Sequence, residues 1–558
     1  MPPAANSQPL PAQPRCQRHR RVAGRRQPVY ERTPGAARAP LPRTYRRRRP
    51  EQTTLYQLVQ EELASFLAQV REQSPYGAGL PGYIEQELRA YLDCGILAHG
   101  FARVRCKQCG EQDLVAFSCK GRGLCPSCTA RRMHDTAAHL VDRVLPHVPV
   151  RHLVLTFPRR IRWHLAQDPK LAGQALRLFV RALHADLRRR GRRQGIAGGR
   201  PAAIAVTQRF GSNLRLNHHI HALVPDGLFV LDPERPDQKR PRFRPLKPPS
   251  DEDVSRLLAK VARRVVDLLR RSGRLDDQPA EPPDALQLTL AVAAGQPTTS
   301  AFEPRPRALC ARLDGFSLDA QVRIHENDRE GLERLCQYVL RPPLAVPRLT
   351  LLDDGNVRYR MKRTLFDGTR EILLSRHQLL ARLCALIPPP RRHTISYFGA
   401  LAANARGRAA LTGQPPPAGR AQTAPTTAAL ACLTAAALAF GTTPPGLPPS
   451  APTPTTAAQT DRLGDPPPRP ARKRTLDWAD LLRRAFAIDV LTCGHCGGPR
   501  QVIAFITEPK VVAQILDHLG LPSTPPPLAP CRGPPDCQPP VPEMAPAADY
   551  FVDPPAID

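Results

Sequence analysis

The chain lacks any apolar run of about 18 residues, the length expected of a membrane-spanning helix. The Ala-rich stretch at residues 427–441 is too short to cross a bilayer. The Arg-rich start also lacks the apolar core and the cleavage pattern of a secretory signal. We therefore expect a cytoplasmic protein that makes no contact with a membrane.

Acidic residues are few in comparison with basic ones. The 49 Asp and Glu stand against 81 Lys and Arg, which gives a formal net charge of +32 that is spread along the chain. An excess of this size favours a polyanionic partner over general solubility charge, and nucleic acid is the first choice. Bound to DNA, the protein would be associated with the nucleoid.

The 15 cysteines do not follow the pattern of a disulfide-rich secreted domain, because the chain is long and several cysteines fall in CxxC pairs. Cys106 and Cys109 are followed, after 15 residues, by Cys125 and Cys128. This spacing predicts one four-thiolate site with a structural Zn²⁺. Cys119 and His134 lie close by but outside the paired spacing, so we interpret them as bystanders.

A third pair, Cys493 and Cys496, is only half of such a site. Cys531 and Cys537 are candidates to complete it, although they stand in a Pro-rich setting.

Composition divides the chain, whose 66 prolines imply much irregular structure, into six segments. We expect a disordered basic arm (1–50), a helical and zinc-ribbon DNA-binding domain (51–147), a larger domain of helices and strands (148–410), an Ala/Pro/Thr-rich linker (411–472), a small C-terminal CxxC module (473–521) and a Pro-rich tail (522–558).

Hydrophobic periodicity predicts a mixture of helices and strands, and hence an α+β fold. Helices are expected over 54–70, 83–92, 131–145, 170–190, 251–272, 328–340 and 376–386. Strands are expected over 101–106, 114–118, 151–157, 204–210, 218–224, 316–324, 348–353 and 357–364. Turn residues at 225–227 and 354–355 predict hairpins and therefore a mainly antiparallel sheet.

His219 and His221 stand one residue apart in a strand-like run. Alternation along a strand points both imidazoles to one face, where they can chelate one divalent metal. If the preceding strand forms a hairpin with this one, Gln208 lies opposite His219 and is a candidate third ligand, but a slip of one residue would turn it away. His218 points to the opposite face and is expected to be dispensable.

Tyr338 is an isolated tyrosine on the predicted helix 328–340, with Arg334 and Arg341 on the same face. An isolated helical tyrosine is most often half-buried packing, but Pro342 and Pro343 end this helix just after it. Two guanidinium groups beside a phenol would favour the phenolate and bind the phosphate that it attacks. Together with the imidazole pair, the pattern predicts a covalent protein–DNA link.

Three features together resemble a known family: residues 216–224 (LNHHIHALV), residues 338–344 (YVLRPPL) and the preceding four-cysteine ribbon. They look like rolling-circle insertion-sequence transposases of the HUH class, and within it like the single-tyrosine transposases with an N-terminal zinc-binding domain (the IS91 type). The likeness covers about residues 52–410, and 478–521 also resembles the family's C-terminal module.

The resemblance implies an HUH endonuclease core over 148–410, an antiparallel sheet with flanking helices, that cuts one DNA strand with Mg²⁺ or Mn²⁺. By this likeness His219 and His221 hold the metal, and Tyr338 attacks the phosphate to give a 5′-phosphotyrosine and a free 3′-OH. The expected partner is DNA, as single-stranded or hairpin ends of the mobile element.

Two positions depart from the family pattern. No second tyrosine stands within a turn of Tyr338, which fits the single-tyrosine type. Asp319 stands where relatives are expected to have histidine, and its carboxylate can also bind a hard cation. The third metal ligand is thus open between Gln208 and Asp319.

Two other functions compete with a transposase. A plasmid-type replication initiator or relaxase would use the same chemistry. A non-catalytic zinc-ribbon DNA-binding protein would explain the charge and the cysteines without using the histidines or the tyrosine.

Overall fold

The computed structural model describes residues 43–45, 47–231, 241–274, 307–362, 364, 368–405, 407–412 and 488–532. All of them belong to one compact unit that begins at Pro42. Most of the expected basic arm, nearly all of the expected linker and the tail after residue 532 lie outside the described residues.

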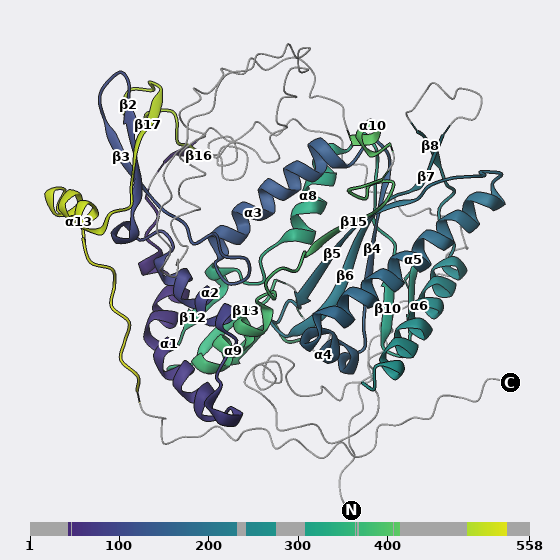
Figure 1. Ribbon diagram of the computed structural model, residues 1–558, viewed down its shortest axis with the longest axis horizontal. Coiled ribbons are helices and arrows are strands. Elements are labelled where there is room, and N and C mark those ends of the chain that lie inside the picture. Colours follow the sequence, from purple (N-terminus) through teal and green to yellow (C-terminus); the bar gives the residue numbers. More distant parts are fainter. Residues whose placement is uncertain are drawn as a thin grey trace, which may run out of the picture. The chain divides into compact units, whose positions relative to one another are not determined.

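The largest sheet in the described part of the chain has seven strands, each paired antiparallel to its neighbours (Figure 1). The order is β15-β5-β6-β4-β10-β9, and β11 also pairs with β4, beyond the end of β10. The bounds are β4 (Val150–Thr156), β5 (Ala202–Phe210), β6 (Leu216–Pro225), β9 (Cys310–Leu313), β10 (Phe316–Asp319), β11 (Arg323–Ile324) and β15 (Ile395–Gly399). The mainly antiparallel α+β architecture is confirmed, whereas the short edge strands β9 and β15 were not expected.

Helices pack on both faces of this sheet (Figure 1). One face buries Leu155 and Ile220 against α4 (Arg159–Gln167), α5 (Pro169–Arg193) and α6 (Asp251–Arg271). The other packs against α3 (Pro126–His139) and α8 (Arg329–Leu340). Because strand residues alternate between the two faces, neighbouring residues of β4 and β6 serve different layers.

Helix α8 begins and ends where its sequence requires. The side chain of Asp328 caps it by accepting a hydrogen bond from the Gly331 N–H at 2.7 Å. Leu332, Cys336 and Val339 are buried against the sheet, and Pro342 follows the last turn. This placement leaves Tyr338 on the exposed side of the final turn.

The hairpin predicted at residues 225–227 is wrong. Strand β7 (Gly227–Val230) pairs with β8 (Arg242–Pro245) and not with β6. The reason is Asp226, whose buried carboxylate pairs with Arg151 at 2.8 Å and with Arg323 at 3.1 Å. A Cβ at Gly227 would collide with the backbone of Arg244, so the chain leaves the sheet through a position that only glycine fits.

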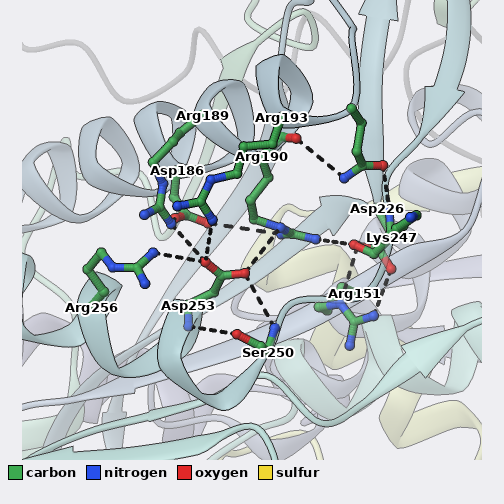
Figure 2. A network of polar contacts seen from close by, with 11 residues as sticks. Arg151, Asp186, Arg189, Arg190, Arg193, Asp226, Lys247, Ser250, Asp253 and Arg256 are labelled. Atoms are coloured by element: carbon green, nitrogen blue, oxygen red, sulfur yellow. Dashed lines mark hydrogen bonds and ion pairs between the residues drawn. The ribbon is translucent and has the colours of Figure 1, made fainter.

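Paired charges join the two long helices on this face. Figure 2 shows the carboxylate of Asp253 on α6, which accepts hydrogen bonds from Arg189 of α5 at 2.9 Å and from Arg256 at 3.0 Å. Asp253 also completes a capping box with Ser250 at the start of α6. The network fixes α5 and α6 against each other.

A separate core joins helices near the start of the chain to elements that follow α8. Its helices are α1 (Thr54–Glu72), α2 (Gly82–Asp93) and α9 (Arg376–Leu386), and its strands are β12 (Leu349–Leu351), β13 (Val357–Arg360) and β14 (Glu371–Leu374). The predicted hairpin at 354–355 is confirmed, with Gly355 at φ +80° in the turn.

A three-stranded sheet combines segments from both ends of the described chain, in the order β17-β2-β3. The elements are β2 (Phe101–Cys106), β3 (Gln112–Ala116), β17 (Arg500–Ile506) and the following helix α13 (Pro509–His518).

The structure also has shorter elements. They are β1 (Arg43–Thr44) paired parallel with β16 (Ile488–Asp489), a π-helical turn (Leu140–Val144) after α3, and α10 (Arg408–Thr412). Among the helices that the structure describes, none combines the length and apolarity that crossing a membrane requires.

Candidate active site and cysteine clusters

His219 and His221 lie on β6, an inner strand of the large sheet, on the face covered by α8. Gln208 of β5 is directly opposite His219, and Val206 is opposite His221. The expected cross-strand register is therefore confirmed. His218 lies on the other face, where its ring contacts Phe157 with centroids 6.2 Å apart.

A third histidine, His152 on β4, joins the pair. Its Nε2 lies 2.9 Å from Nδ1 of His221, and Nε2 of His221 lies 3.1 Å from Nε2 of His219. The row ends where Nδ1 of His219 donates to the backbone carbonyl of Asn217 at 2.7 Å. This last bond leaves Nε2 of His219 as the nitrogen with a free lone pair.

All three imidazoles are deeply buried, with exposed fractions of 4% for His152, 8% for His219 and 2% for His221. Burial lowers the pKa of His152 and of His219 to about 4, and that of His221 to about 2. The rings are therefore neutral near neutral pH, which is the form that binds metal ions.

Tyr338 lies directly over this row. Its ring centroid is 5.9 Å from that of His221 and 6.4 Å from that of His152, both in edge-on arrangements. The side chain is 45% exposed, so the tyrosine adjoins the buried imidazoles while it stays open to a ligand. The structure thus brings together the tyrosine and the histidines that the sequence analysis singled out.

The two arginines beside the tyrosine differ in placement. The guanidinium of Arg341 lies 5.2 Å from the Tyr338 ring centroid and 5.5 Å from that of Phe210. Its Nε is buried and has no hydrogen-bond partner within the described residues. Arg334 instead points to the carboxylates of Asp328 and Glu330, at 3.9 Å and 3.6 Å.

The two candidates for the third ligand are not equally placed. Gln208 stands next to His219, its Nε2 donates to the carbonyl of Val339, and its Oε1 is buried without a hydrogen-bond partner in the described part of the chain. Asp319 on β10 pairs with Val154, which lies between it and His221 in the sheet. Its carboxylate accepts the backbone N–H of Gln321 at 2.9 Å.

A cleft lies between α3, β5 and the end of α8. Gln208, Val339, Arg341, Arg122 and Arg132 are among the residues that line it. A cleft with several guanidinium groups suits a chain of phosphates.

The predicted grouping of four cysteines in one site is wrong. The structure places Cys125 and Cys128 with Cys94 and Cys119, while Cys106 and Cys109 lie with Cys493 and Cys496. The reason is that β2 carries the first CxxC away from α3, which begins next to the second. Cys119 is thus not a bystander, and Cys531 lies outside both clusters; Cys537 lies outside the described residues.

In the first cluster the sulfur–sulfur distances are 3.5 Å for Cys94–Cys125, 3.7 Å for Cys94–Cys128 and 3.5 Å for Cys119–Cys128. Four thiolates about 2.3 Å from a tetrahedral Zn²⁺ lie a little under 4 Å from one another. The arrangement is therefore compatible with a structural zinc ion.

Three members of these sites escaped the sequence analysis or were dismissed by it: His152, Cys94 and Cys119. A histidine on the buried run RHLVLTF is an exception to the apolar pattern that could have drawn attention to His152. Cys94 and Cys119 carry no paired spacing, so only their positions in the fold identify them.

Comparison with known proteins agrees with these features. Residues 202–409 match the family described as "Putative transposase", and residues 60–157 match the family described as "Transposase zinc-binding domain" of the IS91 type. The "Putative transposase y4qJ" of Sinorhizobium fredii is 24% identical over 322 residues, which are 55% of this chain and 72% of that protein. No solved structure matches the chain. The zinc-binding match precedes the transposase match along the chain, and together with this relative they support the assignment of the chain to the insertion-sequence transposases of the IS91 type.

Proposed function

We propose that the protein nicks single-stranded DNA through a 5′-phosphotyrosine intermediate and transfers the strand by a rolling-circle mechanism, on an HUH-type core. The observation that carries the proposal is the approach of Tyr338 to the buried histidine row, 5.9 Å from His221 between ring centroids. The two residues come from a strand and a helix separated by more than a hundred residues. DNA binding alone does not require a tyrosine placed beside buried histidines.

The residues at this site fit a divalent metal. Nε2 of His219 and Nε2 of His221 are 3.1 Å apart, and two donors on an ion about 2.1 Å from each lie about 3 Å apart in octahedral geometry. Of the two candidates for the third donor, Gln208 and Asp319, we propose Gln208. Its Oε1 has no hydrogen-bond partner among the described residues, and it stands opposite His219. A Mg²⁺ or Mn²⁺ ion bound there would polarise the scissile phosphate and offset its charge.

His152 would act as a positioning residue. When Nε2 of His221 is a metal donor, its Nδ1 must carry the proton, and that proton can be donated to Nε2 of His152 at 2.9 Å. His219 is oriented in the same way by the carbonyl of Asn217. Each ligand ring is therefore held by a hydrogen bond on the side away from the donor nitrogen.

The covalent step belongs to Tyr338 and Arg341. The phenolic oxygen gives up its proton and attacks phosphorus, so that a tyrosine–phosphate bond forms. The bond to the 3′ oxygen breaks, and that oxygen takes up a proton to become the 3′-OH. The guanidinium of Arg341, which lies beside the ring, would bind the phosphate oxygens. The cleft lined by Arg122 and Arg132 offers a path for the strand.

The test is incubation of labelled single-stranded element ends with the protein and Mn²⁺. We expect a covalent protein–DNA adduct with the wild type, none with Tyr338→Phe, and loss of cleavage with His219→Ala. His218→Ala is the matched control, because His218 adjoins His219 on the opposite face. An adduct that persists in Tyr338→Phe would refute the assignment, and equal loss in both histidine variants would indicate a folding role.

A further inference from the structure

The second cysteine cluster is built from two turns of the same design. Cys106 and Cys109 are followed by Gly110, and Cys493 and Cys496 are followed by Gly497. In each turn the glycine N–H donates to the carbonyl of the first cysteine, at 3.2 Å for Gly110 and at 3.0 Å for Gly497. Both glycines have positive φ, +78° and +73°, which allows the chain to fold around a pair of sulfur atoms.

The four sulfur atoms converge. Cys106 lies 3.5 Å from Cys496, Cys109 lies 3.6 Å from Cys493, and all four sulfurs lie within 4.8 Å of one another. A disulfide would require about 2.05 Å, and all four are free thiols. Tetrahedral thiolate coordination of Zn²⁺ at about 2.3 Å places sulfurs a little under 4 Å apart. Four thiolates in this arrangement select Zn²⁺ over hard cations such as Mg²⁺.

The surrounding backbone brings the two turns together. Strand β17 runs antiparallel to β2 with Arg500 opposite Cys106, and the Lys107 N–H donates to the Pro499 carbonyl at 2.9 Å. The buried guanidinium of Arg500 pairs with Asp113 on β3 at 2.5 Å. The sheet therefore aligns the second turn with the first.

The C-terminal segment, residues 488–532, has little core of its own. Val512 and Leu516 of α13 are buried against Leu97 and Phe101, which precede and begin β2. Farther on, the Ala529 N–H donates to the carbonyl of Gln60 on α1 at 3.2 Å. This segment is thus ordered on residues that lie some four hundred positions earlier in the chain.

We propose that Cys106, Cys109, Cys493 and Cys496 form a second structural zinc site that fastens the C-terminal segment to strands β2 and β3. Half of its ligands lie outside both regions that match known families. The site is separate from the cluster of Cys94, Cys119, Cys125 and Cys128. Because Cys109 and Cys496 are exposed, it lies at the surface, and a chelator should strip it before the more buried cluster.

The test is the zinc content of the purified full-length chain, measured by elemental mass spectrometry. We expect two ions per chain in the wild type, one per four-cysteine cluster, and one in the double variant C493S/C496S. A competing chelator should release the wild-type zinc in two phases, and the double variant should lack the fast phase. C531S is the matched control, because Cys531 is an exposed cysteine of the same segment outside the cluster.

C496H separates loss of a ligand from damage to the fold, since imidazole also binds Zn²⁺. We expect this variant to keep two ions and both release phases. A wild-type content of one ion overturns the proposal. A content that stays at two in the double variant, or that falls equally in C531S, overturns it as well.

Discussion

At the scale of single residues, the site depends on what each polar group meets after folding. Arg334 and Arg341 share one face of α8 in the sequence pattern, yet only Arg341 keeps an unpartnered, buried nitrogen beside Tyr338 within the described structure. Arg334 is largely exposed and paired with two carboxylates. Proximity along a helix therefore predicted two candidates, and the partners available to each distinguish them.

Arg341→Gln should lower the rate of strand cleavage by about 10- to 100-fold, because a charged hydrogen bond to phosphate contributes about 1.5–3 kcal/mol. Arg334→Gln should change it by less than about threefold, since exposed ion pairs contribute little. Single-turnover cleavage of the labelled strand measures both. A larger loss with Arg334→Gln would restore the role that the sequence pattern gave it.

His184 on α5 gives stability a dependence on pH. Burial lowers its pKa from 6.5 to about 4, and its Nε2 has no hydrogen-bond partner among the described residues. As the pH falls from 6.5 to 4, the unfolded chain takes up a proton here that the folded chain does not, so stability is lost on acidification, by on the order of 3 kcal/mol.

His184→Leu should therefore reduce the fall in the free energy of unfolding between pH 7 and pH 4.5, measured by urea titration at each pH. The exposed His325 provides the comparison, since His325→Leu removes an imidazole that is solvated in the folded chain. Equal slopes in wild type and His184→Leu would contradict the prediction.

At the scale of elements, local pattern predicted the strands and helices well where they alternate or repeat over many residues. Strands β4, β5 and β6 and helices α1, α5, α6 and α8 fall where periodicity places them, and even the partner of His219 followed from a short loop. Asp226 shows the limit. A Pro-Asp-Gly sequence is typical of a turn, but a carboxylate paired with Arg151 across the sheet cannot be read from neighbours in sequence.

Asp226→Asn should destabilise the fold by about 3–5 kcal/mol, because it leaves the buried guanidinium of Arg151 without its counter-charge. Asp267→Asn, which removes a partner of the exposed Arg270, should have a small effect. Urea unfolding at pH 7 measures both. Replacing Arg151 by Met and Asp226 by Leu together should recover much of the loss, and a double variant as unstable as Asp226→Asn would argue against charge burial as the cause.

At the scale of the whole molecule, what sequence could not provide is the pairing of distant segments. Each CxxC indicates half of a metal site, but the choice between Cys125 and Cys493 as the partner of Cys106 depends on β17 reaching β2. The role of His152 could not be predicted for the same reason. A single histidine in a buried strand becomes a candidate site residue only when the fold places it beside His221. The meeting of Tyr338 with His219 and His221 was anticipated from the sequence, whereas the partners of Cys106 and of His152 were not.

The net charge of +32 predicts a strong dependence of DNA binding on salt. Raising the salt concentration from 50 to 200 mM should weaken binding of single-stranded DNA by about 100-fold or more if many phosphates are contacted. Tyr338→Phe should bind with the wild-type affinity and the same salt dependence, because it removes one hydroxyl and no charge. Fluorescence anisotropy measures both, and a binding defect in Tyr338→Phe would mean that its lost cleavage does not report on chemistry alone.

The pairing of β17 with β2 also bears on the timing of synthesis. Strand β2 leaves the ribosome early, yet its neighbour β17 and the cysteines at 493 and 496 emerge almost four hundred residues later. Until then one edge of β2 has no strand beside it, and Leu97 and Phe101 lack the apolar cover that α13 supplies. In a nascent or prematurely terminated polypeptide, the sheet of β2 and β3 thus lacks its third strand and the cover of α13. Only translation past residue 516 supplies both.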